Sequence, residues 1–181
     1  MLLLSGNPLL NAKRIVLWMM VALLLLGLRT RLYAGTGTPS SLVNRRAPDF
    51  SLTDLDHRQI HLAKYHGKVV LLNFWATWRG PCLAEMPRFV AWRREYGGQG
   101  LQVIGVSMDD DPQPVRIAYR KYGLNYPVVM GDEKLGELYG GILGLPVTFL
   151  IDVKGTVRFE HQGATDLNTM QNEVRNLLQP H

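Results

Sequence analysis

Residues 69–82 read VVLLNFWATWRGPC, and this stretch decides the fold. Its first seven residues are apolar except for Asn73, which is typical of a strand buried on both faces of a sheet. A Gly-Pro pair then interrupts the run, and a helical pattern of apolar residues extends from Cys82 to about Tyr96. The stretch therefore predicts a central strand that leads directly into a helix.

The chain beyond this stretch continues to alternate between strand and helix patterns. Strands that alternate with helices predict an α/β domain with parallel central strands, flanked by helices. The predicted elements are a β-hairpin over 47–63, a second buried strand over 101–108, a helix opened by one aspartate of 109–111 with Pro112, a short edge strand at 127–130, a short helix at 134–139, a hairpin formed by 147–151 and 156–161, and a last helix from about 167 to 178. The final hairpin adds an antiparallel edge, so the sheet is expected to be mixed.

The composition restricts the class of protein. The chain has 181 residues, 46% of them hydrophobic and 19% charged, which fits one ordinary domain with a short appendage. Cys82 is the single cysteine. An internal disulfide, a two-cysteine redox centre within the chain and a multi-thiolate metal site are therefore excluded.

The net charge of +5 is unevenly distributed along the chain. All 15 acidic residues lie at or after Asp49, whereas four of the 20 basic residues lie before residue 43. The remainder holds sixteen basic residues against the fifteen acidic ones, a net charge of +1. A nucleic-acid partner is therefore not expected.

The N-terminal segment has the pattern of a membrane anchor. Residues 15–28 contain no charged residue and are flanked by Lys13-Arg14 and by Arg29 and Arg31. A helix of that length rises only about 21 Å against a hydrocarbon core of roughly 30 Å, which suits a signal peptide or a short anchor. We interpret 1–33 as an uncleaved signal-anchor, 34–44 as a flexible tether and 45–181 as the globular domain; cleavage would release a secreted domain.

Two motifs resemble a known family when they are taken together. The segment FWATWRGPC at 74–82 and the segment GLPVTF at 144–149 are similar to the thioredoxin superfamily, and specifically to its TlpA/ResA-like, membrane-tethered extracytoplasmic branch, a relative of the AhpC/TSA redoxins. The opening APDFSL at 47–52 fits the same branch, and the resemblance covers about residues 43–179. It implies a thioredoxin-like fold, a cis bond before Pro146, a periplasmic domain, and thiol–disulfide exchange that often serves cytochrome c maturation.

The sequence departs from that family at the position that carries the chemistry. Family members use two cysteines, of which the first attacks a substrate disulfide and the second resolves the mixed disulfide. Arg79 stands at the first position here, and Cys82 matches the second. The resemblance therefore implies an activity reduced to single-thiol chemistry through Cys82, with protein thiols or disulfides of client proteins as partners and an external thiol as reductant.

A second class of function is a non-catalytic binding module. In the family, residues before the cis-proline pair with the backbone of an extended peptide. Such a surface can survive the loss of the chemistry. We expect it to comprise Trp78, Arg79, Pro81, Leu145 and Pro146.

The state of Cys82 separates these two hypotheses. A helix N-terminus and a neighbouring Arg79 favour a thiolate, whereas desolvation raises the pKa of a thiol and would make Cys82 a small buried apolar residue. We interpret Glu85, one turn further along, as an exposed carboxylate near the helix N-terminus. A single base change turns a Cys codon into an Arg codon, so a recent lesion at Arg79 is a further alternative.

Other single-cysteine chemistries receive weaker support. A one-cysteine peroxidase needs a hydroxyl residue three positions before the cysteine and a proline seven before it, where this chain has Arg79 and Trp75. Copper delivery needs two cysteines and a histidine. No metal and no cofactor is expected.

Overall fold

The computed structural model describes residues 41–179. Residues 41–179 form one compact unit, and the predicted signal-anchor, 1–33, and residues 34–40 of the predicted tether lie outside the described residues. Among residues 41–179, no helix is both long enough and apolar enough to cross a membrane.

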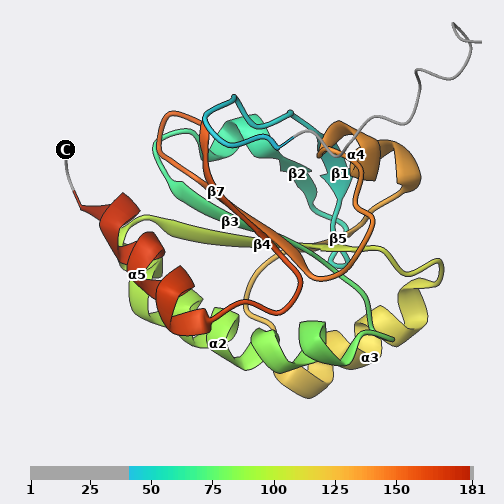
Figure 1. Cartoon of the computed structure of the whole chain (residues 1–181). Coiled ribbons are helices and arrows are strands. Elements are labelled where there is room, and N and C mark those ends of the chain that lie inside the picture. Colours follow the sequence, from blue (N-terminus) through green and yellow to red (C-terminus); the bar gives the residue numbers. More distant parts are fainter. Residues whose placement is uncertain (1–40, 180–181) are drawn as a thin grey trace, which may run out of the picture. The chain divides into compact units, whose positions relative to one another are not determined.

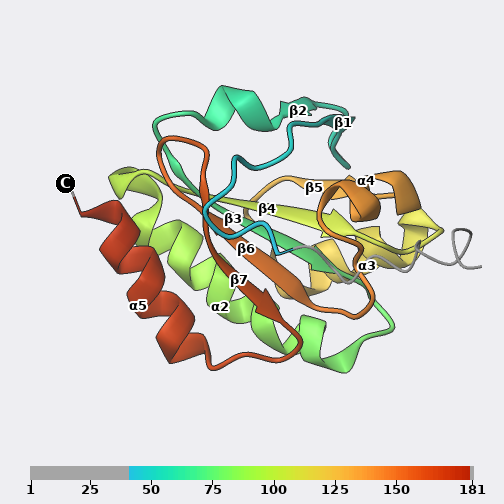
Figure 2. The ribbon, with the colours of Figure 1, turned by 45° about the horizontal axis from the view of Figure 1, so that its top comes forward.

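A five-stranded sheet forms the centre of the domain, in the order β5-β4-β3-β6-β7 (Figures 1 and 2). Strands β3, β4 and β5 are parallel, while β6 and β7 run antiparallel, so the sheet is mixed as predicted. The strands are β3 (Val69–Trp75), β4 (Leu101–Ser107), β5 (Val128–Met130), β6 (Val147–Ile151) and β7 (Val157–Gln162).

Helices cover both faces of this sheet. Figure 1 shows α2 (Gly80–Tyr96), α3 (Pro112–Tyr122) and α5 (Leu167–Leu178) beneath the sheet, and α4 (Glu133–Leu138) above it. Both parallel crossovers, β3-α2-β4 and β4-α3-β5, step in the same direction along the sheet. Because such crossovers are right-handed, α2 and α3 lie on the same face.

A two-stranded sheet lies above the main sheet with α4. Strands β1 (Ser51–Thr53) and β2 (Gln59–His61) pair antiparallel and lead into a short 3-10 helix, Leu62–Tyr65; a second one, Gly97–Gln99, follows α2. The two strands are much shorter than the predicted span 47–63. Residues 41–44, assigned by the sequence to the tether, lie against β7, since Leu42 is buried and Asn44 N–H donates to the carbonyl of Val157.

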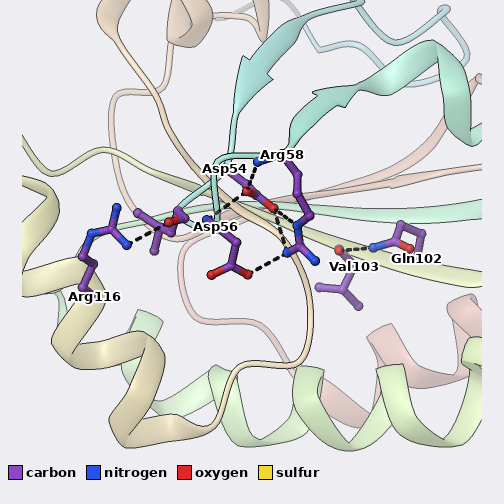
Figure 3. Close-up of polar contacts among 7 residues, drawn as sticks. Asp54, Asp56, Arg58, Gln102, Val103 and Arg116 are labelled. Atoms are coloured by element: carbon purple, nitrogen blue, oxygen red, sulfur yellow. Dashed lines mark hydrogen bonds and ion pairs between the residues drawn. The ribbon is translucent and has the colours of Figure 1, made fainter.

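A polar cluster stabilises the β1–β2 turn (Figure 3). The turn itself joins the edge of the main sheet through its backbone, because the Leu55 N–H donates to the carbonyl of Val128 on β5. The buried carboxyl group of Asp54 accepts from the backbone N–H of Asp56 and Arg58 and from Arg58 Nε, at 2.8–2.9 Å. Arg58 Nη2 also lies 2.8 Å from Asp56 Oδ2. Arg116 on α3 donates to the carbonyl of Leu55, so α3 supports the same turn.

Candidate functional site

The carboxyl ends of β3 and β4 form the floor of the candidate site. The N–H of Met108 donates to the carbonyl of Trp75, which holds the two strand ends together. The buried carboxyl group of Asp109 then accepts from the backbone N–H and the hydroxyl of Thr77, at 2.9 and 2.5 Å, and from the hydroxyl of Ser107. The loop between β3 and α2 is thereby fixed in place. The sequence did not identify Asp109 in this role, and Asp111 rather than Asp109 caps α3, through Gln113 N–H.

Helix α2 starts directly after this loop. Arg79 is its N-cap, with Pro81 in the first turn, and the carbonyl of Arg79 accepts from the N–H of Cys82 and Leu83. Helix α2 begins two residues before the predicted start at Cys82. This arrangement places Arg79 at the surface and Cys82 in the first turn beneath it.

The Arg79 side chain reaches the loop that precedes β6. Its Nε and Nη2 donate to the carbonyl oxygen of Leu145, at 3.2 and 3.1 Å. The guanidinium carbon also lies 5.9 Å from the ring centre of Trp78, a cation–π distance. The bond between Leu145 and Pro146 is cis, as the resemblance implied. Arg79 therefore joins the start of α2 to the cis-proline loop, 66 residues further along the chain.

Cys82 is shielded in this arrangement, with only 1% of its surface exposed. Burial is the largest influence on its thiol and raises the pKa, and the nearby Glu85 carboxyl group acts in the same direction. Hydrogen bonding with the Ala76 backbone and the charge of Arg79 only partly oppose this shift. The net effect is a pKa above the ordinary value of a thiol, which favours the protonated form of Cys82.

Glu85 is buried, with 4% of its surface exposed, so its interpretation as an exposed carboxylate is wrong. Desolvation raises its pKa to about 7, although hydrogen bonding with the Thr165 backbone opposes the shift. Its Oε2 is buried without a hydrogen-bond partner among the described residues. A sequence signal for this burial existed, because Glu85 has the helical spacing of the buried Cys82, Met86 and Phe89.

A small cavity of about 140 Å³ opens beside Arg79. The loop 139–145 lines it, with Glu160 and Gln162 of β7 on the wall. Gly140 and Gly141 have φ angles of 90° and 81°, which side-chain-bearing residues rarely adopt. On the outside, Leu143 is 85% exposed and Trp78 is 66% exposed. Two large apolar side chains are thus presented to solvent at this edge.

The predicted site residues therefore fall into two groups. Arg79, Leu145 and the cis-proline are brought together, Trp78 contacts Arg79, and Pro81 is exposed in the first turn of α2. Cys82 lies in the interior below them. No group of three or more His, Cys, Asp or Glu side chains within 41–179 is arranged to hold a metal ion.

The central strand β3 leads directly into α2, and a cis-proline precedes the antiparallel strands β6 and β7. This combination defines a thioredoxin-like protein. The model of the AhpC/TSA family matches residues 43–160, and the chain belongs to this family, as a ResA-like member of the thioredoxin superfamily.

Known proteins are similar over most of the chain. The thiol-disulfide oxidoreductase ResA of Geobacillus thermodenitrificans is 36% identical over 149 residues, which covers 81% of this chain and 86% of the relative. ResA of Bacillus subtilis is 34% identical over 135 residues, 74% of each chain. A solved thiol:disulfide interchange protein of the thioredoxin family from Chlorobium tepidum aligns with a TM-score of 0.70 and 28% identity, over 77% of this chain and all of that one.

Proposed function

We propose that this chain is an extracytoplasmic, membrane-tethered protein of the thiol-disulfide oxidoreductase lineage that binds extended segments of client proteins at its cis-proline surface. The observation that carries the proposal is the contact between Arg79 and the Leu145 carbonyl above a thiol that is 1% exposed. Arg79 occupies the position of the attacking cysteine. With a single cysteine in the chain, the usual dithiol cycle has no second thiol.

The surface supports binding in two ways. The β6 ladder begins only at Val147, so the backbone of Leu145 has no strand partner, and an extended peptide can pair with it when Arg79 releases the Leu145 carbonyl. Trp78 and Leu143 expose apolar area beside it, and such side chains are typical contacts for a partner. The apolar run 15–28 supports the membrane tether. Cytochrome c maturation, implied by the resemblance, is the process in which we expect the clients to act.

Single-thiol exchange through Cys82 is the second candidate. The position of the thiol in the first turn of α2, with Arg79 lowering its pKa, favours this reaction. The Cys82 thiolate would attack a client disulfide, form a mixed disulfide and release one client thiol. An external thiol would then attack the client sulfur of the mixed disulfide, which forms a disulfide between the client and the external thiol and releases Cys82; a second external thiol would reduce that bond. The first step requires the Cys82 thiol, which is 1% exposed, to become accessible to the client. A one-cysteine peroxidase has no comparable support, because Arg79 replaces the hydroxyl residue and burial raises the pKa of Cys82.

Binding is tested with the full chain in detergent and an array of extended peptides. We expect Trp78→Ser and Leu143→Ser each to reduce binding several-fold. Val153→Ser is the matched control, because Val153 is also exposed but lies just beyond the opposite end of β6. Equal binding by all three variants, or no binding by the wild type, overturns the proposal.

The state of the thiol is tested by the pH dependence of Cys82 alkylation. We expect slow labelling of the native chain, with an apparent pKa above that of a free thiol, and fast labelling after unfolding. Fast native labelling with an apparent pKa well below about 8.5 would instead favour single-thiol exchange.

A further inference from the structure

We infer that Arg79 makes the cis-proline surface selective for client segments that carry a carboxylate beside the backbone that pairs with Leu145. This inference rests on the proposed binding function and names the class of segment that the surface accepts. It depends on the hydrogen bonding of Arg79 and on the charges around it.

Arg79 is exposed and has no carboxylate partner among residues 41–179, where its side chain donates only to the neutral carbonyl of Leu145. Arg58 shows the contrast, because it pairs with both Asp54 and Asp56. A planar guanidinium binds a carboxylate through two parallel charge-assisted hydrogen bonds, which are stronger than bonds to a neutral carbonyl. Arg79 therefore forms stronger hydrogen bonds when a client carboxylate replaces the Leu145 carbonyl as its acceptor.

The same exchange frees the acceptor that a peptide requires. While Arg79 donates to the Leu145 carbonyl, a client N–H must compete for that oxygen. A segment with a carboxylate draws Arg79 away and then donates its own N–H to Leu145, so every polar group keeps a partner. A neutral segment either displaces Arg79 without replacing its hydrogen bonds or shares the carbonyl with it, and both cost binding free energy.

The negative charge of Glu160 favours a client carboxylate at the mouth of the cavity over one inside it. Glu160 on the cavity wall accepts from Leu42 N–H, Ser41 Oγ and Gln162 Nε2 and makes no ion pair with Arg79. Its negative charge opposes a second carboxylate deep in the cavity. The exposed Trp78 and Leu143 beside Arg79 provide apolar contacts for the neighbouring residues of the segment.

The test uses the full chain in detergent and an array of extended peptides in matched pairs that differ only by Asp or Asn at one position. Each pair is made with a free and with an amidated C-terminus, which distinguishes a side-chain from a terminal carboxylate. If a side-chain carboxylate is recognised, we expect the Asp peptide to bind about five- to tenfold more tightly than the Asn peptide. If the terminal carboxylate is recognised, we expect the same factor between the free and the amidated peptide. High salt should reduce this preference.

Two variants locate the source of the preference. Arg79→Met should abolish it and strengthen binding of the neutral peptides, because the Leu145 carbonyl is then free. Arg94→Met removes the same charge from the exposed last turn of α2 and should leave the preference unchanged. Equal binding of Asp and Asn peptides by the wild type, or a preference that persists in Arg79→Met, overturns the inference while the binding function stands. If no peptide of either kind binds, the proposed function fails and the inference fails with it.

Discussion

The carboxyl group of Asp109 binds Thr77 through both the backbone N–H and the hydroxyl of that residue. Asp109 follows β4 and Thr77 follows β3, so one buried side chain joins the ends of the two central strands. The loop that leads into α2 depends on this link. Arg79 and Cys82 come directly after it, and their positions depend on it in turn.

Replacing Asp109 by alanine should therefore loosen the site. Asp109→Ala leaves the Thr77 N–H and the Thr77 and Ser107 hydroxyls without their acceptor, which we expect to cost about 2–3 kcal/mol in free energy of unfolding. Urea unfolding measures the loss, and alkylation of Cys82 should become faster. Asp110→Ala is the control, because Asp110 is exposed. Equal effects of the two variants would refute the assigned role.

The raised pKa of Glu85 predicts how stability changes with pH. The folded chain holds a proton on Glu85 up to about pH 7, whereas the unfolded chain releases it near pH 4.5. The folded state therefore binds more protons between these values, and stability falls as the pH rises through this interval. At pH 8, the free energy of unfolding of Glu85→Gln should exceed that of the wild type by on the order of 2 kcal/mol, so the variant unfolds at higher urea. At pH 4 the two proteins should unfold at similar urea concentrations.

Glu95 provides the control for this experiment. It is exposed on the same helix, so Glu95→Gln should not increase the resistance to urea at pH 8. If Glu85→Gln followed the wild type at both pH values, Glu85 would not be titrating near pH 7 in the folded chain.

Arg79→Cys tests whether the surrounding site supports the two-cysteine chemistry of its relatives. The change restores a Cys-Gly-Pro-Cys sequence at 79–82, and we expect an internal disulfide and reductase activity towards a model disulfide such as insulin. Arg79→Ser also removes the contact to Leu145 but adds no second thiol, so it should form no internal disulfide and should not gain this reductase activity. A disulfide that forms in Arg79→Cys without activity would mean that the surrounding surface has diverged as well.

The Asp54 cluster should stabilise the domain unequally through its two carboxylates. Asp54 is buried and accepts from two backbone N–H groups and Arg58, so Asp54→Ala should cost about 2–3 kcal/mol of unfolding free energy. Asp56 is exposed, and Asp56→Ala should cost less than about 1 kcal/mol. Denaturant unfolding of both variants checks the order, and the reverse order would contradict the arrangement in Figure 3.

Much of the fold could be predicted from local patterns. The bounds of β3 and α5 agree with the sequence predictions at both ends, and β4 ends one residue earlier than predicted. Long apolar runs and helical spacing are local properties, so they survive without tertiary information. The single cysteine likewise determined by itself that no two-thiol centre exists within the chain.

Only the tertiary structure decided how the polar side chains are used. Arg79 contacts Leu145, 66 residues away in the sequence, and Thr77 contacts Asp109, 32 residues away. Hydrogen-bond partners of long side chains depend on which loops the sheet brings together, and a local pattern does not contain that information. The sequence by itself therefore determined the scaffold and the missing thiol, whereas packing decided that Cys82 is shielded and that Arg79 covers the cis-proline edge.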